Sequence, residues 1–270
     1  MVTVRLSAPL VRAIIIAALL AVWEALPRLG LISTLFLPPL SDTLRVLVID
    51  WREYLGALLV SLGEVAVALV FACGGGILAG AAIGSVTVLR RLLLPVASSL
   101  YAVPLVILYP VLTVWLGIGP ESKIAFAAIN GFLPTALATA AGIRTIDPNL
   151  LLAARSMGAT LPQRVLRVVI PASIPTVLAG LRLGGVLVIV SVVVSEMLTS
   201  TAGIGYEVTR YRTVLDSTHV FGAVLLIVVV TWLFDRCARA LEHWGAAWQP
   251  QAHAARRAAR AELGAAMPAE

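Results

Sequence analysis

The chain has 270 residues, of which 60% are hydrophobic and only 13% are charged, and its mean hydropathy is +0.99. A soluble domain of this length needs far more charge on its surface, so the composition excludes that class. The net charge of +6 does not indicate nucleic-acid binding, because the arginines are scattered between apolar runs rather than clustered with aromatic residues.

Six apolar runs are long enough to cross a bilayer as helices, since a hydrocarbon core of about 30 Å needs about 20 residues. They fall at residues 8–27, 62–84, 93–115, 124–142, 177–197 and 218–240. We therefore predict an all-α, polytopic membrane protein with one transmembrane domain over residues 1–247. The first run lacks a small-residue cleavage site and is interpreted as an uncleaved helix. Residues 248–270 are predicted to be a disordered cytoplasmic tail.

The positive charges indicate how these helices cross the membrane. With the N-terminus inside, six of the 20 Lys and Arg residues fall on the outer side, namely Arg28, Arg45, Arg52, Lys123, Arg210 and Arg212. The other fourteen fall on the inner side, which is the bias expected of cytoplasmic segments. We expect both termini and the 143–176 loop to face the cytoplasm of a bacterial cell, with the helices in its inner membrane.

Residues 40–59 have apolar positions at helical spacing on one side and charged residues on the other. This pattern predicts a single amphipathic helix lying along the outer interface and packing against the bundle. Ser41, which follows two prolines, is expected to be its N-cap.

Residues 147–171 break the apolar pattern. Asp147 is a good N-cap, Pro148 suits the first helical position and Gly158 suits a C-terminal cap, so we predict a helix of about three turns. A second helix is predicted from about Thr160 to Val169, ended by Pro171. The result is a helix, turn and helix too short to cross the membrane.

One face of the first short helix carries Leu151, Ala154, Arg155 and Gly158. Small residues allow another protein to approach the backbone closely, and a short apolar helix in a cleft is a common docking mode. Packing of this loop on its own bundle explains the same spacing, and the residues alone leave both alternatives open.

The loop resembles the signature of binding-protein-dependent ABC importer permeases, written EAA, three residues, G, nine residues, I-x-L-P. In "LAARSMG" and "VVIP", the signature positions are taken by Ala153, Ala154, Gly158, Val168 and Pro171. The resemblance implies that the loop docks on a separate ATPase subunit through Leu151, Leu152, Ala153, Ala154, Arg155 and Gly158.

The resemblance extends along most of the chain. The stretches "LPPLSDT" (37–43), "VPLVILYPVLTVWLGIGPESKI" (103–124) and "SEMLTSTAGIGYEV" (195–208) are similar to permeases for nitrate, sulfonates and taurine. Three positions depart from the family pattern: Leu152 replaces the signature glutamate, Leu105 replaces a frequent proline, and Glu64 lies at a helix start where a basic residue is common.

The resemblance implies a homodimeric transport subunit that is not itself an enzyme and holds no cofactor or metal. Two ATPase subunits would bind ATP and Mg, and a periplasmic or lipid-anchored binding protein would deliver a small solute such as an oxyanion or organic acid. The chain has no phosphate-binding G-x-x-x-x-G-K-[ST] motif. The glycines of "GGGILAG" (74–80) are interpreted instead as sites of close helix packing.

Polar residues in the apolar runs are the candidates for a pathway. Glu196 is the first, because an ionisable group near lipid is costly unless it faces protein or water. Asn130 and Tyr109 are further candidates. All three residues also fit a role in bonding one helix to another.

Two other functions are possible for a polytopic membrane protein: a secondary transporter and a membrane-embedded enzyme. A secondary transporter of small organic solutes would draw on ion gradients and usually has internal repeats and buried ionisable residues; the sequence shows no convincing repeat, and we expect no buried acid–base relay. A membrane-embedded enzyme would need a catalytic constellation, and the three histidines lie in or beyond the flanks of the last span. Neither alternative explains the 147–171 loop.

Overall fold

The computed structural model describes residues 8–246, so the predicted tail at 248–270 lies outside the described part. Within that part the secondary structure is helical, with no strand, which confirms the all-α prediction. Among residues 8–246, five helices are long and apolar enough to cross a membrane. A bent pair of helices makes a sixth span if the pair is counted as one, so the six-span prediction is confirmed in that sense.

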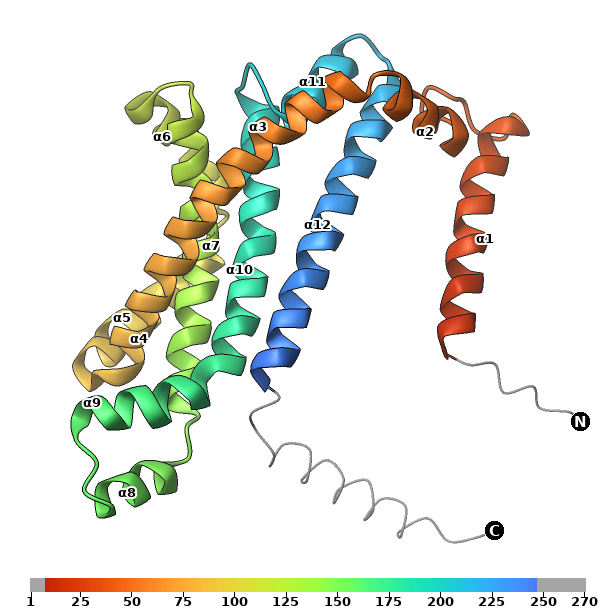
Figure 1. Ribbon diagram of the computed structural model, residues 1–270. Coiled ribbons are helices and arrows are strands. Elements are labelled where there is room, and N and C mark those ends of the chain that lie inside the picture. The colour runs from red at the N-terminus through yellow and green to blue at the C-terminus, as the bar shows by residue number, and fades with distance from the viewer. Residues whose placement is uncertain (1–7, 247–270) are drawn as a thin grey trace, which may run out of the picture.

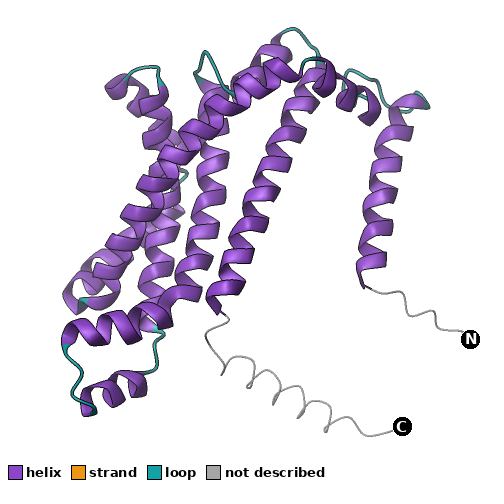
Figure 2. Ribbon diagram, in the orientation of Figure 1, coloured by secondary structure: helices purple, strands orange, loops and turns teal. Residues whose placement is uncertain are grey.

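The helices form a bundle in which α7 and α10 occupy the centre (Figures 1 and 2). Their bounds are α1 Ala8–Arg28, α2 Leu40–Ile49, α3 Trp51–Leu69, η1 Val70–Gly74, α4 Gly75–Ser85, α5 Thr87–Ala102, η2 Leu105–Leu108, α6 Tyr109–Leu116, α7 Pro120–Arg144, α8 Pro148–Ser156, α9 Leu161–Arg164, η3 Val165–Val169, α10 Ile170–Leu198, α11 Ile204–Thr213 and α12 Ser217–Ala246. The start of α1 and the end of α12 lie at the same end of the molecule as α8 and α9, called here the α8 end (Figure 1). The opposite end is called the α11 end.

Helix α1 stands apart from the bundle for most of its length (Figure 1). It is anchored at the α11 end, where Trp23 donates a hydrogen bond from Nε1 to the carbonyl oxygen of Pro38 at 3.0 Å. Glu24 accepts one from the backbone N–H of Ser41 at 3.0 Å. The prediction that Ser41 is an N-cap is wrong: Pro39 precedes α2, and Ser41 lies in the first turn, where its hydroxyl bonds to Glu24.

The predicted interfacial helix over residues 40–59 is not a single helix. It breaks at Asp50, whose backbone leaves helical geometry (φ −99°, ψ 27°). Helix α2 ends before this residue, and the next membrane helix begins at Trp51 rather than at residue 62 and runs to Ser85 through a π-helical turn. Glu64 therefore lies well inside α3 and not at a helix start.

The third predicted span, 93–115, is also not one straight helix. Helix α5 ends at Ala102, and the segment from Leu105 to Leu116 is turned by 89° relative to it. Pro104 explains the break, because proline lacks an N–H and its ring disfavours helical geometry at the preceding residue. Val103 is accordingly extended (φ −79°, ψ 136°).

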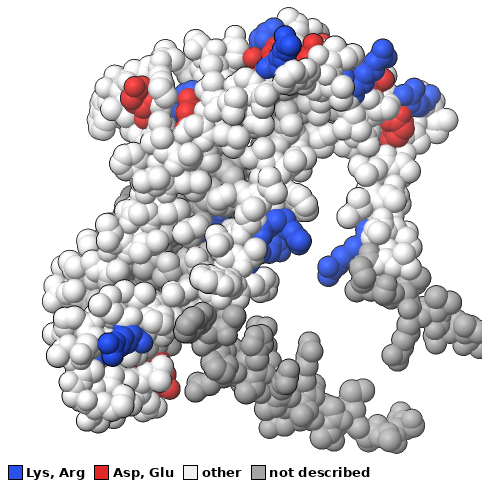
Figure 3. Space-filling model, viewed as in Figure 1, with Lys and Arg blue, Asp and Glu red and all other residues white. Residues whose placement is uncertain are grey.

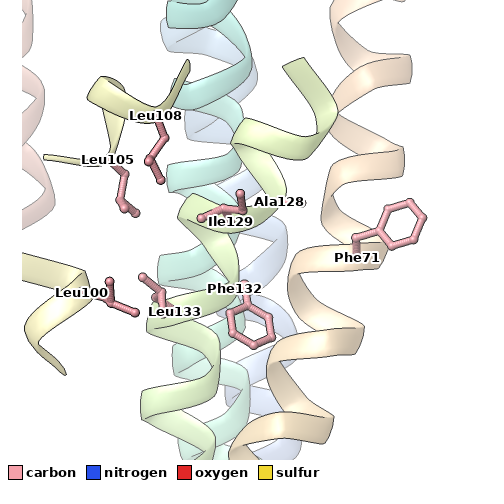
Figure 4. A pocket seen from close by; sticks show the side chains of 8 residues that line it. All are labelled: Phe71, Leu100, Leu105, Leu108, Ala128, Ile129, Phe132 and Leu133. Atoms are coloured by element: carbon pink, nitrogen blue, oxygen red, sulfur yellow. The ribbon is translucent and has the colours of Figure 1, made fainter. Parts of the chain in front are cut away.

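The bent segment leaves an apolar cavity of ≈390 Å³ against α7. Leu100 and Leu105 extend from the bent segment toward the side chains of Ile129 and Leu133 on α7 (Figure 4). The other lining residues are Phe71, Leu108, Ala128 and Phe132. All eight side chains are hydrocarbon, so this cavity offers a polar solute no hydrogen-bonding side chain.

Glycines allow α4 and α10 to approach α7 closely. A Cβ atom at Gly80 of α4 would lie 2.4 Å from the carbonyl oxygen of Ala136 on α7. A Cβ atom at Gly184 of α10 would lie 2.6 Å from the carbonyl oxygen of Gly131 on the same helix. Neither position has room for a side chain, and a Cβ atom at Gly76 would lie 2.8 Å from Thr135 Cβ. The interpretation of the 74–80 glycines as packing sites is therefore confirmed for Gly76 and Gly80 and is wrong for Gly74, where a Cβ atom would meet no heavy atom within 4 Å.

We predict that Gly80→Ala destabilises the protein by about 1–3 kcal/mol, the usual cost of forcing an extra carbon into a packed interior. Gly74→Ala is the matched control, because a Cβ atom there meets no heavy atom within 4 Å. Thermal unfolding in detergent measures both. Equal stability of the two variants would contradict the packing shown for α4 and α7.

Charged side chains gather mainly at the α11 end, over α2 and α11, above a largely uncharged surface (Figure 3). Several of them join helices: Arg210 of α11 contacts Glu53 of α3 at 2.5 Å and Glu207 at 2.9 Å. Tyr211 also donates a hydrogen bond to Glu53 at 2.8 Å. These contacts fix α11 against the start of α3.

Candidate functional site

The short helix of the 147–171 segment forms as predicted. Helix α8 spans Pro148–Ser156, and the Asp147 carboxylate accepts a hydrogen bond from the backbone N–H of Asn149 at 2.9 Å. Gly158 has φ +76°, a left-handed conformation that favours glycine over residues with a side chain. The cap residues at both ends of α8 are therefore confirmed.

The second helix of this segment does not end at Pro171. Helix α9 passes through the π-helical turn η3 into α10, so one helical stretch runs from Leu161 to Leu198. A proline inside a helix removes one backbone hydrogen bond and crowds the preceding turn. The π turn ends at Val169, two residues before Pro171, so the departure from regular α-helical geometry lies next to the proline.

The residues predicted to dock on a partner differ in exposure. Leu152 is 62% exposed, and Ala153, Arg155 and Gly158 are exposed as well. Leu151 is half-buried, and Ala154 is only 4% exposed, because α8 packs against α9 and η3 on that side. Two more apolar side chains of the segment, Met157 (80%) and Leu161 (67%), extend the exposed surface.

A second candidate site is a cavity of ≈580 Å³ toward the α11 end, called here the polar cavity. It is lined by α3, by the start of α7 and by the loop that follows α10. The lining residues are Leu59, Val60, Gly63, Glu64, Val67, Ile118, Gly119, Pro120, Lys123, Ile124, Thr199, Ser200, Thr201 and Ala202.

Two charged side chains of this lining form a buried ion pair. Lys123 of α7 contacts the Oε1 atom of Glu64 on α3, and the side chains are 5% and 6% exposed. Lys123 also donates a hydrogen bond to the hydroxyl of Ser200 at 3.2 Å. We expected no buried acid–base relay; the structure shows one buried acid–base pair, and the Lys123 side chain, which the charge pattern assigned to the outer side, is buried.

The second carboxylate oxygen of Glu64, Oε2, is buried and has no hydrogen-bond partner. A buried carboxylate is costly unless its oxygens are paired, and one cation satisfies only part of its capacity. The pair therefore leaves an unused acceptor beside the polar cavity.

Glu196, predicted as a pathway residue, is 1% exposed and bonded on both carboxylate oxygens. Oε1 accepts from the Ser61 hydroxyl at 2.6 Å, and Oε2 accepts from the backbone N–H of Gly205 at 2.8 Å. Ser61 in turn accepts from the backbone N–H of Ile204 at 2.8 Å. Glu196 thus ties the segment after α10 to α3.

The same loop leaves no room for side chains at its glycines. A Cβ atom at Gly205 would lie 2.3 Å from the carbonyl oxygen of Val193. Gly203 has φ +108° and lies against the Glu196 carboxylate. The glycines of "TAGIG" therefore allow the backbone to reach the buried carboxylate.

Tyr109 and Asn130, the other two predicted pathway residues, lie apart from the polar cavity lining. Tyr109 is 1% exposed, and its hydroxyl donates to the carbonyl oxygen of Thr199 at 3.1 Å. Asn130 is half-buried and donates to the carbonyl oxygen of Phe126 on its own helix at 3.0 Å. Of the three residues, Tyr109 and Glu196 support the loop that lines the cavity.

Three residues around the polar cavity were not predicted from the sequence as site residues: Ser61, Glu64 and Lys123. A signal for two of them was present, because ionisable residues within apolar stretches are expected to pair or to face a cavity. Glu64 is the acid inside the second apolar run, and Lys123 directly precedes the fourth. Their spatial pairing required the packing of α3 on α7.

We predict that Glu196→Met destabilises the protein by about 1–3 kcal/mol, because it leaves the buried backbone N–H of Gly205 without an acceptor and leaves the Ser61 hydroxyl only its longer bond, at 3.3 Å, to the carbonyl oxygen of Ala57. Glu196→Gln is the matched control, since its amide can accept from Gly205 and donate to Ser61. Thermal unfolding compares the two, and limited proteolysis reports on the loop between α10 and α11, residues 199–203. A methionine variant as stable as the glutamine variant would contradict this role.

Residues 73–244 match the family described as the binding-protein-dependent transport system inner membrane component. The taurine transport system permease protein TauC of Escherichia coli (strain K12) is 31% identical over 240 residues, which cover 86% of this chain and 87% of that protein. The putative aliphatic sulfonates transport permease protein SsuC of Bacillus subtilis (strain 168) is 29% identical over 236 residues, covering 86% and 85%.

Solved structures show the same fold at lower identity. A chain of the inward-facing MetNI methionine ABC transporter is 20% identical, with a TM-score of 0.55 over 67% of this chain and 92% of that chain. A chain of an amino acid ABC transporter solved with histidines is 18% identical, with a TM-score of 0.56 over 73% and 94%. The helical arrangement therefore matches those structures over most of the solved chains.

Proposed function

This chain belongs to the family of binding-protein-dependent transport system inner membrane components, and we propose that this ABC importer permease works as a homodimer bound to two ATPase subunits. The family match and the similarity to TauC and SsuC permeases support the importer assignment. The small number of spans supports a closed two-fold dimer, because one chain with five or six membrane spans has few helices with which to enclose a polar pathway.

The observation that carries the proposed partnership is the exposed apolar surface of α8 and its flanks. Leu152, Met157 and Leu161 together present apolar side chains at an end of a membrane protein where α8 and α9 project from the bundle (Figure 1). An ATPase subunit with a matching cleft would cover this surface, bind ATP and Mg, and couple hydrolysis to movement of the helices. Leu152 stands where the family has a glutamate that would form an ion pair with the ATPase, and it would make an apolar contact there instead.

We place the α8 end in the cytoplasm of a bacterial cell and the α11 end on the periplasmic side of its inner membrane. The arginine bias supports this orientation. A periplasmic or lipid-anchored binding protein would then deliver the solute to the α11 end, where the polar cavity lies.

The substrate proposed from the relatives is a small sulfonate, taurine or a related organic acid or oxyanion, because the TauC and SsuC names refer to taurine and aliphatic sulfonates. The chain itself would catalyse no covalent reaction, and the chemistry of ATP would be supplied by its partner.

The test of this function is uptake of a labelled solute by vesicles that contain the permease and its copurified ATPase. We predict that uptake stops when ATP is depleted and continues when ion gradients are collapsed. The reverse result would support the second candidate, a secondary transporter, which the buried Glu64–Lys123 pair keeps open. Purification of the permease without any bound ATPase subunit would also contradict the proposal.

We predict that Leu152→Ala weakens binding of the ATPase subunit by about 1–3 kcal/mol, the loss expected for a buried leucine side chain. The effect should vary little with salt, because no ion pair is screened at this position. Subunit affinity in detergent, measured across a salt series, reports both properties.

Leu31→Ala is the control for this measurement, because Leu31 is 68% exposed and lies in the connection between α1 and α2 at the other end of the molecule. It should leave the affinity unchanged. Unchanged affinity of Leu152→Ala, or an equal loss in both variants, would show that the Leu152 side chain does not contact the partner.

A further inference from the structure

A histidine at the α11 end lies among acidic and aromatic side chains. His219 is in the first turn of α12, and its ring stacks on those of Tyr211, with centroids 4.4 Å apart, and Tyr54, with centroids 6.4 Å apart. The Tyr54 hydroxyl also donates a hydrogen bond to the backbone carbonyl oxygen of His219 at 3.0 Å. The histidine side chain is 19% exposed, so water and protons reach it.

Both ring nitrogens of His219 lie next to a carboxylate. Nε2 is 3.2 Å from Oδ2 of Asp50, and Nδ1 is 2.8 Å from Oδ2 of Asp216. The Nε2 contact has hydrogen-bond geometry, whereas the Nδ1 contact is an ion pair without a well-directed hydrogen bond. A neutral imidazole has one N–H and one lone pair, so it donates to only one of two carboxylates. The arrangement is therefore complementary to the protonated ring, in which both nitrogens carry a hydrogen.

These contacts join three segments of the chain. Asp50 lies at the break between α2 and α3, Tyr211 lies in the last turn of α11, and Asp216 lies in the turn between α11 and α12. In this turn Leu215 has φ +59°, a conformation that a residue with a side chain keeps only where its surroundings hold it. Asp216 contributes to that restraint, because its Oδ1 atom also accepts from the backbone N–H of His219 at 3.2 Å.

The charges around the ring favour its protonated form. The ionisable side chains that face it, or contact one that does, come from each neighbouring element: Asp50 at the end of α2, Glu53 and Tyr54 of α3, Glu207, Arg210 and Tyr211 of α11, and Asp216 of the turn. The carboxylates in this set outnumber its one cation, Arg210, which is itself paired with Glu53 and Glu207. Tyrosine is uncharged below about pH 10.

We propose that His219 is a pH-dependent clamp on the turn between α11 and α12. The charged ring binds Asp50 and Asp216 together and holds the turn. The neutral ring keeps the well-directed bond from Nε2 to Asp50 and loses its attraction to Asp216, so the turn and the end of α11 become more mobile. This inference goes beyond the proposed import function, because it assigns a regulatory device to the α11 end whichever solute is carried.

The direction of the pH dependence follows from the charge of the bound form. Free histidine titrates near pH 6.5, and the two carboxylates stabilise the charged ring of the folded chain. Stabilisation of the turn is therefore complete at low pH and is lost as the pH rises and the folded ring releases its proton. The medium that bathes the α11 end sets the state of the clamp.

The test is hydrogen–deuterium exchange of the full-length chain in lipid nanodiscs at about pH 5.5 and about pH 8.5, on either side of the histidine range. Peptides that cover residues 212–220 report on the turn, after correction for the intrinsic pH dependence of exchange. We predict that their protection falls about tenfold between the two pH values, as expected for the loss of one charge-assisted contact. Peptides from the centre of α7 are the internal reference and should keep their protection.

His219→Gln should remove most of this pH dependence, because the amide does not gain a charge. His243→Gln is the matched control: His243 is exposed in the last turn of α12, far from the cluster, so its variant should keep the native dependence. Asp216→Asn provides a second variant should His219→Gln not fold. Its amide oxygen still accepts from the backbone N–H of His219, but the charge that attracts the protonated ring is gone, so the pH dependence should also be lost.

Equal protection of the turn at both pH values in the native chain would overturn the proposal. A native pH dependence that survives in His219→Gln or in Asp216→Asn would overturn it as well, and so would an equal loss in His243→Gln. Because the measurement follows backbone exchange and not transport, any of these results leaves the importer function untouched.

Discussion

The close approach of α7 to α4 and α10 is the constraint on which the rest of the structure depends. Glycines at Gly80 and Gly184 bring the backbones of the neighbouring helices against α7, where association in lipid relies on packing because hydrocarbon offers no hydrophobic driving force. The position of α7 then sets the position of Lys123 in its first turn, and the same packing holds α3 near enough for Glu64 to reach it. The polar cavity is a consequence of this arrangement.

The features that the sequence predicts well are those that depend on local chemistry. The apolar runs predict the membrane helices because the thickness of a bilayer fixes the length of a span. Asp147 and Gly158 mark the ends of α8 because a cap bonds to its own helix end, and no distant residue is needed to form it. Within the 74–80 run, Gly76 and Gly80 are the close-packing positions, although the sequence does not identify α7 as their neighbour.

The features that the sequence does not predict depend on contacts between distant residues or on competing local effects. Apolar composition predicts one span over residues 93–115, whereas the helix breaks at Pro104. The prediction misses this break because hydropathy does not measure the loss of one backbone N–H. Glu196 was considered for a pathway, yet its partners Ser61 and Gly205 come from α3 and from the loop beyond α10. A buried polar residue indicates that partners exist, and only the packing of the helices identifies them.

The break at Pro104 also limits which side of the molecule can touch lipid. Leu105 and Leu108 share a cavity with Ala128 and Ile129, which lie about two turns inside α7, so the break lies within the depth of the hydrocarbon. A helix interrupted there exposes backbone carbonyl and amide groups that hydrocarbon cannot satisfy. Val103 is 50% exposed. The surface around this residue must therefore be covered by protein or by water in the membrane, and the lipid acyl chains must lie against other faces.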